Sequence, residues 1–246
     1  MEYDNLNLDK FCTTDFAYWI GVVQTDGFLK KLFRKNRNRI TYYIGLGVGN
    51  KSKPMLNKFV TLSKSLFEIN GSFFNGVSKE GFETSQFIFG CTSLIPFYER
   101  IGLNFKDLSP PSFILNSNEL FGAYLAGVID GDGNVNISRK EYPQCKIRIY
   151  SGKIELQLAN AIEKILDCKV NQIKRSHKSR IKNRFFVSNS VVMEFRVYPK
   201  NFDFIKNFVL PHMALDYKSV KVEGYIKFRR ATSGNRTHFK RELQFF

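Results

Sequence analysis

Two apolar segments of the chain end in the same way, and this repetition constrains the fold more than any other feature. The segments are FAYWIGVVQTDGF at residues 16–28 and FGAYLAGVIDGDGNV at residues 121–135. Their final aspartates, Asp26 and Asp132, are 106 residues apart. Almost no charge precedes these aspartates, so as helices the segments would be buried on all sides. Two such helices predict two similar halves that pack through them.

The segments that follow repeat as well. A basic, strand-like segment comes next, RITYYIGLGVG at 39–49 and CKIRIYSG at 145–152, and an amphipathic segment follows each. Further strand-like pairs lead to a matching phrase in each half, IGLNFKDL at 101–108 and MALDYKSV at 213–220. The order is helix, two strands, helix, two strands, helix. The sequence therefore predicts an α+β fold of two pseudo-symmetric αββαββα halves.

A proline pair marks the boundary between the halves. Pro110 and Pro111 prevent a helix from continuing through this region. We expect an N-terminal half at 1–108, a linker at 109–118, and a C-terminal half at 119–246 that ends in a basic tail.

Glycines at matching positions predict how the two apolar helices meet. Gly21 and Gly127 are equivalent, and glycine lets two backbones approach closely. Gly27 and Gly133 follow the aspartates, where glycine often ends a helix in the left-handed conformation. We expect a close helix contact and then a left-handed cap in each half.

Composition narrows the functional classes. Thirty-eight Lys and Arg against 22 Asp and Glu leave a formal net charge of +16, which favours a polyanionic partner. The four cysteines form no C-x-x-C pair and there are three histidines, which disfavours a zinc site and a disulfide framework. This cysteine usage favours an intracellular location, either an organelle (mitochondrion or chloroplast) or a prokaryotic cytoplasm. No apolar run approaches the length of a membrane span, so no membrane partner is expected.

The two aspartates stand where a carboxylate is unfavourable. A helix C-terminus is already negative, so each charge there costs about 0.3–1 kcal/mol, and bringing two together adds repulsion. A cation is therefore expected, and Mg²⁺ takes carboxylate and carbonyl oxygens while keeping substrate phosphates in its shell. Such a pair suits metal-assisted hydrolysis of a phosphodiester. The alternative, two ordinary Asp-Gly turns, would have to hold for both members of the duplication.

The second motif, LAGVIDGDG at Leu125 to Gly133, resembles the signature of the LAGLIDADG homing endonucleases, and WIGVVQTDG at Trp19 to Gly27 is a looser match. The resemblance covers both halves and nearly the whole chain. It implies a site-specific endonuclease that hydrolyses phosphodiester bonds on both strands of a long, asymmetric double-stranded DNA target. It also implies a curved antiparallel sheet in each half, laid into the DNA major groove, and Mg²⁺ as cofactor, with Mn²⁺ or Ca²⁺ able to substitute for binding.

The resemblance assigns metal ligands. Asp26 and Asp132 become the catalytic ligands, and the backbone carbonyls of Thr25 and Gly131 would assist them. The protein could be encoded within an intron, in which case its function would be intron homing. It could also be encoded by a free-standing gene.

The resemblance also assigns helper residues in each half. The family places a basic residue over the cleavage centre, a role that Lys106 and Lys218 fit by their matching phrases. It places a polar residue at the end of the second strand, where it orders water, and Asn50 and Ser151 fit that role. A lysine there would stabilise charge on the phosphate or help polarise the attacking water. The alternative for each lysine is a solvated surface position.

The two motifs have diverged. Gln24 stands where the second motif has Asp130, which favours a monomer on an asymmetric site over a homodimer on a palindrome. One competing interpretation is a maturase, an RNA-splicing protein on the same scaffold that binds intron RNA. Another is a DNA-binding regulator that does not cleave. Both tolerate loss of an aspartate, so the presence of both aspartates favours cleavage, and dual activity stays open.

Strand alternation predicts which side chains face DNA. Polar and basic residues at every second strand position would read base edges, while basic hairpin loops at 30–39 and 174–184 would contact phosphates. For any one of these residues the alternative is a solvated surface. The residues expected to contact DNA are Lys30, Lys31, Arg34, Arg37, Arg39, Thr41, Tyr43, Asn134, Asn136, Ser138, Arg139, Lys140, Lys146, Arg148, Tyr150, Lys174, Arg175, Lys178, Arg180 and Arg184.

Overall fold

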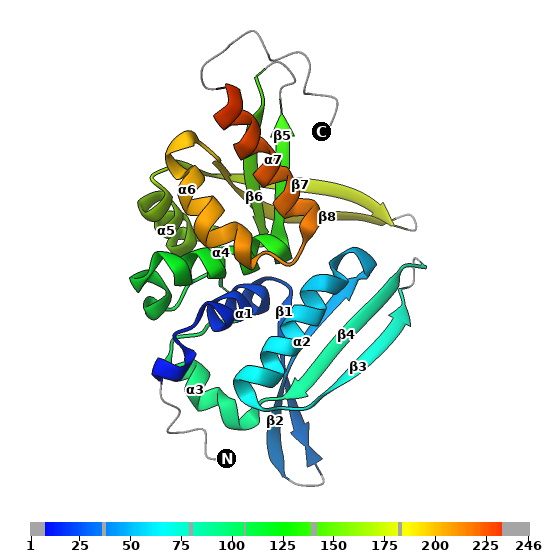
Figure 1. Ribbon diagram of the computed structural model, residues 1–246. Helices are drawn as coiled ribbons and strands as arrows, with labels where there is room; N and C mark the ends of the chain where they lie inside the picture. Colours follow the sequence, from blue (N-terminus) through cyan, green and yellow to red (C-terminus); the bar gives the residue numbers. More distant parts are fainter. Residues whose placement is uncertain are drawn as a thin grey trace.

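The computed structural model describes residues 8–35, 38–78, 81–105, 107–138, 142–181 and 184–232, without the side chains of 177–186 and 188. Two four-stranded antiparallel sheets lie on either side of a central helix pair (Figure 1). The N-terminal half has α1 (Thr14–Thr25), β1 (Gly27–Arg34), β2 (Arg39–Gly49), α2 (Lys53–Phe67), β3 (Gly71–Val77), β4 (Glu83–Gly90) and α3 (Ile95–Arg100).

The C-terminal half repeats this order and extends it. The sheet orders, β1-β2-β4-β3 and β5-β6-β8-β7, are equivalent, which confirms the two pseudo-symmetric halves predicted from the sequence. The elements are α4 (Asn118–Asp132), β5 (Gly133–Ser138), β6 (Gln144–Ser151), α5 (Leu156–Leu166), β7 (Val170–Ile181), β8 (Arg184–Arg196), α6 (Phe202–Phe204), which runs on into a π-helical turn at Ile205–Val209, and α7 (Asp216–Thr232).

The central helices α1 and α4 pack as closely as their glycines permit. Residues 16–24 and 121–130 are all buried, which confirms that the apolar segments are core helices. A Cβ built on Gly21 would overlap the carbonyl oxygen of Tyr124 and lie 3.1 Å from the Cα of Gly127. A Cβ on Gly127 would overlap the carbonyl oxygen of Tyr18. Backbone therefore meets backbone at this crossing, as expected.

The glycines after the aspartates play a different part from the one expected. Gly133 has φ −84° and ψ 149°, an extended conformation, and Gly27 is not among the residues with positive φ. The prediction of left-handed caps was wrong. A Cβ on Gly27 would lie 2.5 Å from the carbonyl oxygen of Val23, and one on Gly133 would overlap that of Ile129. Glycine is needed because the chain passes directly from helix to strand against the last helical turn.

Two segments expected as hairpin loops are mostly strand. Most of the basic segment at 30–39 lies in β1 and β2. The segment at 174–184 lies within β7 and β8, whose pairing runs to Ile181 and Arg184. Long alternating runs of lysine and arginine extend a strand as well as they occupy a loop, since cross-strand pairing overrides their weak propensity.

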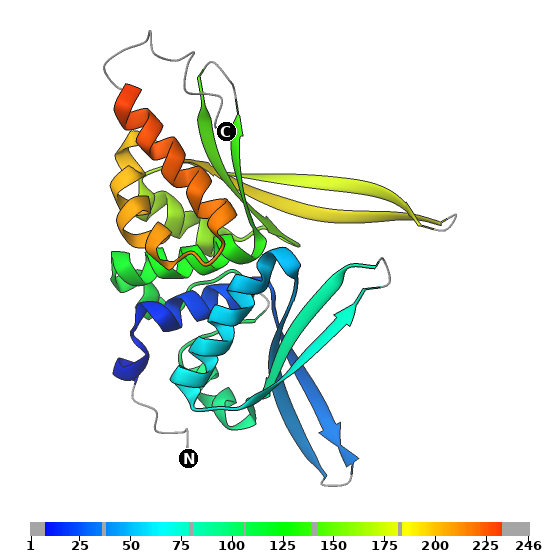
Figure 2. The ribbon, with the colours of Figure 1, turned by 45° about the vertical axis from the view of Figure 1, so that its right-hand side comes forward.

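The helices lie on one side of both sheets. In the N-terminal sheet, Ile44, Leu46 and Phe87 are buried on the face that α2 covers. Among the residues that the structure describes, no helix covers the opposite faces, and the hairpins β3–β4 and β7–β8 project toward the same side of the molecule (Figure 2). Within the described residues, no helix combines the length and apolar character needed to cross a bilayer.

Candidate active site

The aspartates of the two motifs stand at the C-terminal ends of the central helices. Asp26 follows α1 directly, and its backbone N–H donates to the carbonyl oxygen of Val22. Asp132 is the last residue of α4. Because α1 and α4 pack against each other at their glycines, their C-terminal ends lie side by side. The side chains of Asp26 and Asp132 are both half-buried there.

Both carboxyl groups are hard to ionise where they stand. Burial raises the pKa of Asp26, and the positive charge of Lys218 opposes this rise. Burial also raises the pKa of Asp132, the charge of Asp26 raises it further, and Lys218 lowers it, for a value of about 6. The two carboxylates therefore repel one another across the helix ends, as expected from the sequence.

Lys218, from the first turn of α7, supplies a positive charge at this point. Its side chain is 6% exposed, and its ammonium group donates to the carbonyl oxygens of Ile129 at 2.8 Å and Asp130 at 2.7 Å. A cation on the last carbonyls of a helix is favoured by the helix dipole. The lysine therefore caps α4 and lies beside the aspartates. Lys106, its expected counterpart, is outside the described residues.

The donor set fits a magnesium-type ion that is completed by substrate. Across the described parts of the chain, no group of three or more His, Cys, Asp or Glu could hold a metal. Two carboxylates with the neighbouring carbonyls leave positions for water and phosphate oxygens, which is how Mg²⁺ is commonly held. Of the two predicted carbonyls, that of Gly131 lies 3.4 Å from the Lys218 ammonium.

Thr25 and Gly131 are complementary across the helix pair. A Cβ built on Gly131 would overlap the side chain of Thr25, so the glycine of one helix makes room for the threonine of the other. The Thr25 hydroxyl donates back to the carbonyl oxygens of Gly21 and Val22, each at 3.0 Å. Its own backbone carbonyl remains the predicted ligand.

Two tyrosines join the helices by equivalent hydrogen bonds, which the sequence analysis missed. The Tyr18 hydroxyl donates to Asp130 Oδ2 at 2.9 Å, and the Tyr124 hydroxyl donates to Gln24 Oε1 at 2.7 Å. Tyr18 and Tyr124 are 106 residues apart, the same separation as the motif aspartates. That repeat distance could have identified them as a pair.

The residue two positions before each motif aspartate, Gln24 or Asp130, ties its helix to a distant loop. Asp130 Oδ2 accepts the backbone N–H of Ala214 at 2.6 Å. Gln24 Nε2 donates to the carbonyl oxygens of Asn104 at 2.9 Å and Ser109 at 3.0 Å. An acid accepts from N–H groups and an amide donates to carbonyls, so the divergence between the motifs follows the backbone groups that each half presents. In both halves these hydrogen bonds reach the matching segment that carries the lysine, at 213–220 in one half and at 101–109 in the other.

Asn50 and Ser151 occupy positions that are not equivalent. Gly27 pairs with Leu46, while Gly133 pairs with Ile149, so strand register matches Ser151 to residue 48 and not to Asn50. The Ser151 hydroxyl donates to Glu155 at 2.8 Å, and Asn50 donates to Glu83 at 2.7 Å. Both side chains are held by glutamates, and their roles in ordering water stay predictions.

On the N-terminal sheet, strand pairing separates two neighbouring lysines. Lys30 pairs with Tyr43, and Arg34 shares their face and donates to the Tyr43 hydroxyl. Lys31 lies on the other face, where its ammonium is 5.8 Å from the ring centroid of Tyr42. Lys30, Arg34 and Tyr43 are therefore on the uncovered face, and Lys31 points away from it.

Arg39 and Thr41 share the face of Tyr43 but differ in exposure. Arg39 is exposed and pairs with Arg34 at the end of the hairpin. Thr41 is 9% exposed, and its hydroxyl donates to the carbonyl oxygen of Leu32 at 3.3 Å. The Thr41 hydroxyl group is thus already engaged within the protein.

On the C-terminal sheet the alternation follows the predicted pattern. Val135, Ile147 and Ile149 are buried, while the residues between them are half-buried or exposed. Arg175 pairs with Ser190 on the uncovered face, and Lys174 pairs with buried Val191 on the other. The predicted contacts on the uncovered face of this sheet are Asn134, Asn136, Ser138, Lys146, Arg148, Tyr150 and Arg175.

Six of the predicted DNA contacts cannot be placed by side chain. Arg37, Arg139 and Lys140 are outside the described residues. Lys178, Arg180 and Arg184 lie in β7 and β8, but the structure describes only their backbone.

A carboxylate on the uncovered face was also missed. Glu194 is 7% exposed, and its two oxygens accept from Lys146 and from Arg148 Nε, each at 2.7 Å. Both ion pairs lower its pKa against the effect of burial. The available signal was an acid at 194, in the strand-like segment MEFRVY at 193–198.

Known proteins resemble this chain in fold more than in sequence. No family model matches it. The DNA-directed RNA polymerase subunit Rpo1C of Methanocaldococcus jannaschii is 28% identical over 155 residues, 62% of this chain. The match spans 15% of that protein's length, so its activity is not carried over.

Solved structures match nearly the whole chain. I-DmoI in complex with DNA and Ca has a TM-score of 0.55 at 13% identity and covers 87% of this chain and 99% of its own. The LAGLIDADG homing endonuclease I-GzeII in complex with its DNA target has 0.54 at 11%, covering 92% and 95%. I-WcaI bound to its DNA recognition sequence has 0.50 at 14%, covering 84% and 85%.

This chain has the fold of a LAGLIDADG homing endonuclease. The resemblance drawn from its two motifs is thereby confirmed for the architecture. Within this LAGLIDADG fold, the two motif helices form the interface of the halves, the motif aspartates meet at its end, and both uncovered sheet faces flank them (Figure 2). The positions of Asp26 and Asp132 follow from this arrangement.

Proposed function

We propose that the protein is a metal-dependent, site-specific endonuclease that cuts both strands of a double-stranded DNA target. The observation that carries this proposal is the meeting of Asp26 and Asp132 at the ends of two buried helices, each carboxyl group with a raised pKa. A carboxylate pair kept at a cost is typical of a functional site. The DNA complexes of I-DmoI, I-GzeII and I-WcaI, which share the fold, support DNA as the substrate.

The chain's own residues divide the task. The carboxylates of Asp26 and Asp132 would hold divalent ions, with the carbonyls of Thr25 and Gly131 nearby. A bound ion supplies Lewis-acid stabilisation of the phosphate and makes water more acidic. Lys218 is fixed on the end of α4 and places a buried positive charge beside both acids. That charge stabilises negative charge that develops on a phosphate between them.

Magnesium is the proposed ion. The donor set has few protein ligands and leaves room for water and substrate oxygens, which suits Mg²⁺. I-DmoI has been solved with Ca, and a variant of it with its target DNA and Mg, so divalent ions accompany this fold in relatives. One polypeptide carries both halves, and their different sheet faces favour a monomer on an asymmetric target.

The test begins with the target. A random double-stranded DNA library is selected for binding in Ca²⁺, and the recovered sequences are then incubated with Mg²⁺ or with EDTA. Double-strand cleavage at one long site in Mg²⁺, absent in EDTA, is the expected result. Asp26→Asn and Asp132→Asn should each lower cleavage by at least two orders of magnitude while leaving binding within a few fold.

The matched control is Asp203→Asn. Asp203 is an exposed aspartate that pairs with Arg230 far from the helix ends, so its loss should leave cleavage unchanged. Sequence-specific binding without cleavage in any divalent metal would instead support a regulator. Preferential binding of structured intron RNA would support a maturase.

A further inference from the structure

At several equivalent positions of their uncovered faces, the two sheets present different chemistry. Strand register defines the equivalence, because Gly27 and Gly133 begin β1 and β5. One residue into each strand, Phe28 pairs with Gly45, and Asn134 pairs with Arg148. The C-terminal sheet thus has polar and charged side chains where the N-terminal sheet has a ring and a glycine.

The next strand continues the contrast. Gly45 pairs with Ile88, whereas Arg148 pairs with Glu194. The ion cluster of Lys146, Arg148 and Glu194 is therefore replaced in the N-terminal sheet by Tyr43, Gly45 and Ile88. At the far end of the first strand, Ser138 is replaced by Leu32. Less polar residues therefore replace polar or charged ones at these positions. The neighbouring β3 position does not differ in this way, since Phe74 is matched by Ile173, another exposed apolar residue.

In the C-terminal sheet the cluster of Lys146, Arg148 and Glu194 orients Arg148 so that it can bind a DNA base. Glu194 accepts from Arg148 Nε at 2.7 Å and from Lys146 at 2.7 Å, so both cations are held across the strands. The contact through Nε leaves the two terminal nitrogens of Arg148 as paired donors. Paired arginine donors match the O6 and N7 acceptors of guanine in the major groove. A guanidinium held by a carboxylate loses less rotamer entropy when it binds.

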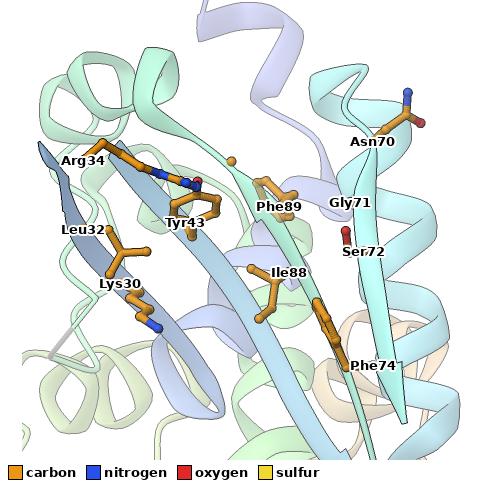
Figure 3. Close-up of a pocket in the computed structure, with 11 residues that line it drawn as sticks. Lys30, Leu32, Arg34, Tyr43, Asn70, Gly71, Ser72, Phe74, Ile88 and Phe89 are labelled. Atoms are coloured by element: carbon orange, nitrogen blue, oxygen red, sulfur yellow. The ribbon is translucent and has the colours of Figure 1, made fainter. Parts of the chain in front are cut away.

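In the N-terminal sheet part of this region is a mostly apolar hollow, with Asn70 and Ser72 at its β3 side (Figure 3). A Cβ built on Gly45 would overlap the Phe28 ring, so that ring lies over the glycine and fills its place. Leu32 and Ile88 point from β1 and β4 across the hollow, and Phe74, which is 53% exposed, flanks it from β3. No carboxylate shares this face among these residues.

The rim of the hollow is basic. Lys30 and Arg34 line it, and Arg34 donates to the Tyr43 hydroxyl (Figure 3). Cations at the edge suit the phosphates that run beside a groove. The floor then faces base edges with methyl and ring surface, and the base group that complements such a surface is the 5-methyl of thymine.

Resting on the proposed function, we propose that the target is asymmetric in composition. The half-site under the N-terminal sheet is rich in thymine, whose methyl groups contact Leu32 and Ile88. The half-site under the C-terminal sheet presents a guanine to Arg148. The two halves therefore read DNA by different chemistry, and the apolar patch of the first sheet is a specificity surface.

Deoxyuridine tests this directly, because it pairs like thymine but lacks the methyl group. The selected target is resynthesised with every thymine of one half-site replaced by deoxyuridine, and binding is measured in Ca²⁺, where cleavage does not interfere. We expect affinity to fall about fourfold for each contacted methyl in the N-terminal half-site, the fold-change of burying one methyl-sized group. Replacement in the other half-site should leave affinity within about twofold.

Protein variants assign the half-sites. Leu32→Ala should reduce the deoxyuridine effect in one half-site only, and that half-site is then the one under the N-terminal sheet. The matched control is Phe33→Ala, since Phe33 is the next residue of β1, is 59% exposed and lies on the other face. Arg148→Ala should relax the guanine preference at one position of the other half-site, by about tenfold.

The outcomes separate the two proposals. Equal deoxyuridine effects in both half-sites, or an effect that Leu32→Ala leaves intact, would overturn the compositional asymmetry while the endonuclease stands. A selected target with no guanine preference sensitive to Arg148→Ala would also overturn it. Failure to select any DNA sequence would overturn the endonuclease itself, and this inference with it.

Discussion

Replacing Asp132 with asparagine is expected to make the metal-free protein more stable at neutral pH. Burial, and then the charge of Asp26, raise the pKa of Asp132 from 3.8 to about 6. A carboxyl group with a raised pKa holds its proton more tightly in the folded chain than in the unfolded one, so folding becomes less favourable as pH rises. The loss begins near pH 3.8, where the unfolded group ionises, and is complete above about pH 6.

The size of the effect follows from the shift. About two pKa units at roughly 1.4 kcal/mol each correspond to about 3 kcal/mol above pH 6. Because Asp132 is half-exposed, solvent screening reduces this to about 1–2 kcal/mol. Asparagine keeps the shape and removes the charge, so Asp132→Asn should recover that amount. For a chain of this size the melting temperature should rise by about 2–8 °C.

Thermal unfolding followed by circular dichroism, between about pH 5 and pH 8, measures this. In EDTA the wild type should lose stability relative to Asp132→Asn as pH rises through about 6. Magnesium should reverse the difference, because an ion that binds only the folded state stabilises it. The exposed control Asp203→Asn should change neither result. A lower melting temperature for Asp132→Asn than for the wild type at neutral pH in EDTA would refute the reasoning.

Three further perturbations follow from the helix interface. Gly127→Ala should destabilise the protein by about 2–3 kcal/mol in urea unfolding, since its Cβ would overlap the carbonyl oxygen of Tyr18; an unchanged midpoint would show that the helices can separate freely. Tyr18→Phe should cost about 1.5–3 kcal/mol and Tyr124→Phe about 0.5–1.5, because the first bonds a carboxylate and the second a neutral amide; the reverse order in the same assay would contradict this. Lys218→Met should raise the pKa of Asp132 above about 6, so the pH at which metal-free stability declines should move upward in melting curves, and a downward move would exclude the lysine's assigned role.

The sequence was sufficient for the architecture. Apolar runs at 16–23 and 121–129 determine buried helices, because they carry no charged residue on any side. Their repetition 106 residues apart determines two similar halves and brings Asp26 and Asp132 together. Alternation along the strands determines that one face of each sheet is apolar. These are local or periodic properties, and a single chain displays them without its fold.

Only the tertiary structure decided which partner each polar side chain has. Lys218 caps a helix whose last turn is nearly ninety residues earlier, and no local pattern records that meeting. The left-handed conformation expected at Gly27 and Gly133 gave way to an extended one, because packing, more than propensity, decided how each helix enters its sheet. Strand register likewise separated Lys30 from Lys31 and set Glu194 between two cations, since register depends on hairpin turns and on cross-strand pairing.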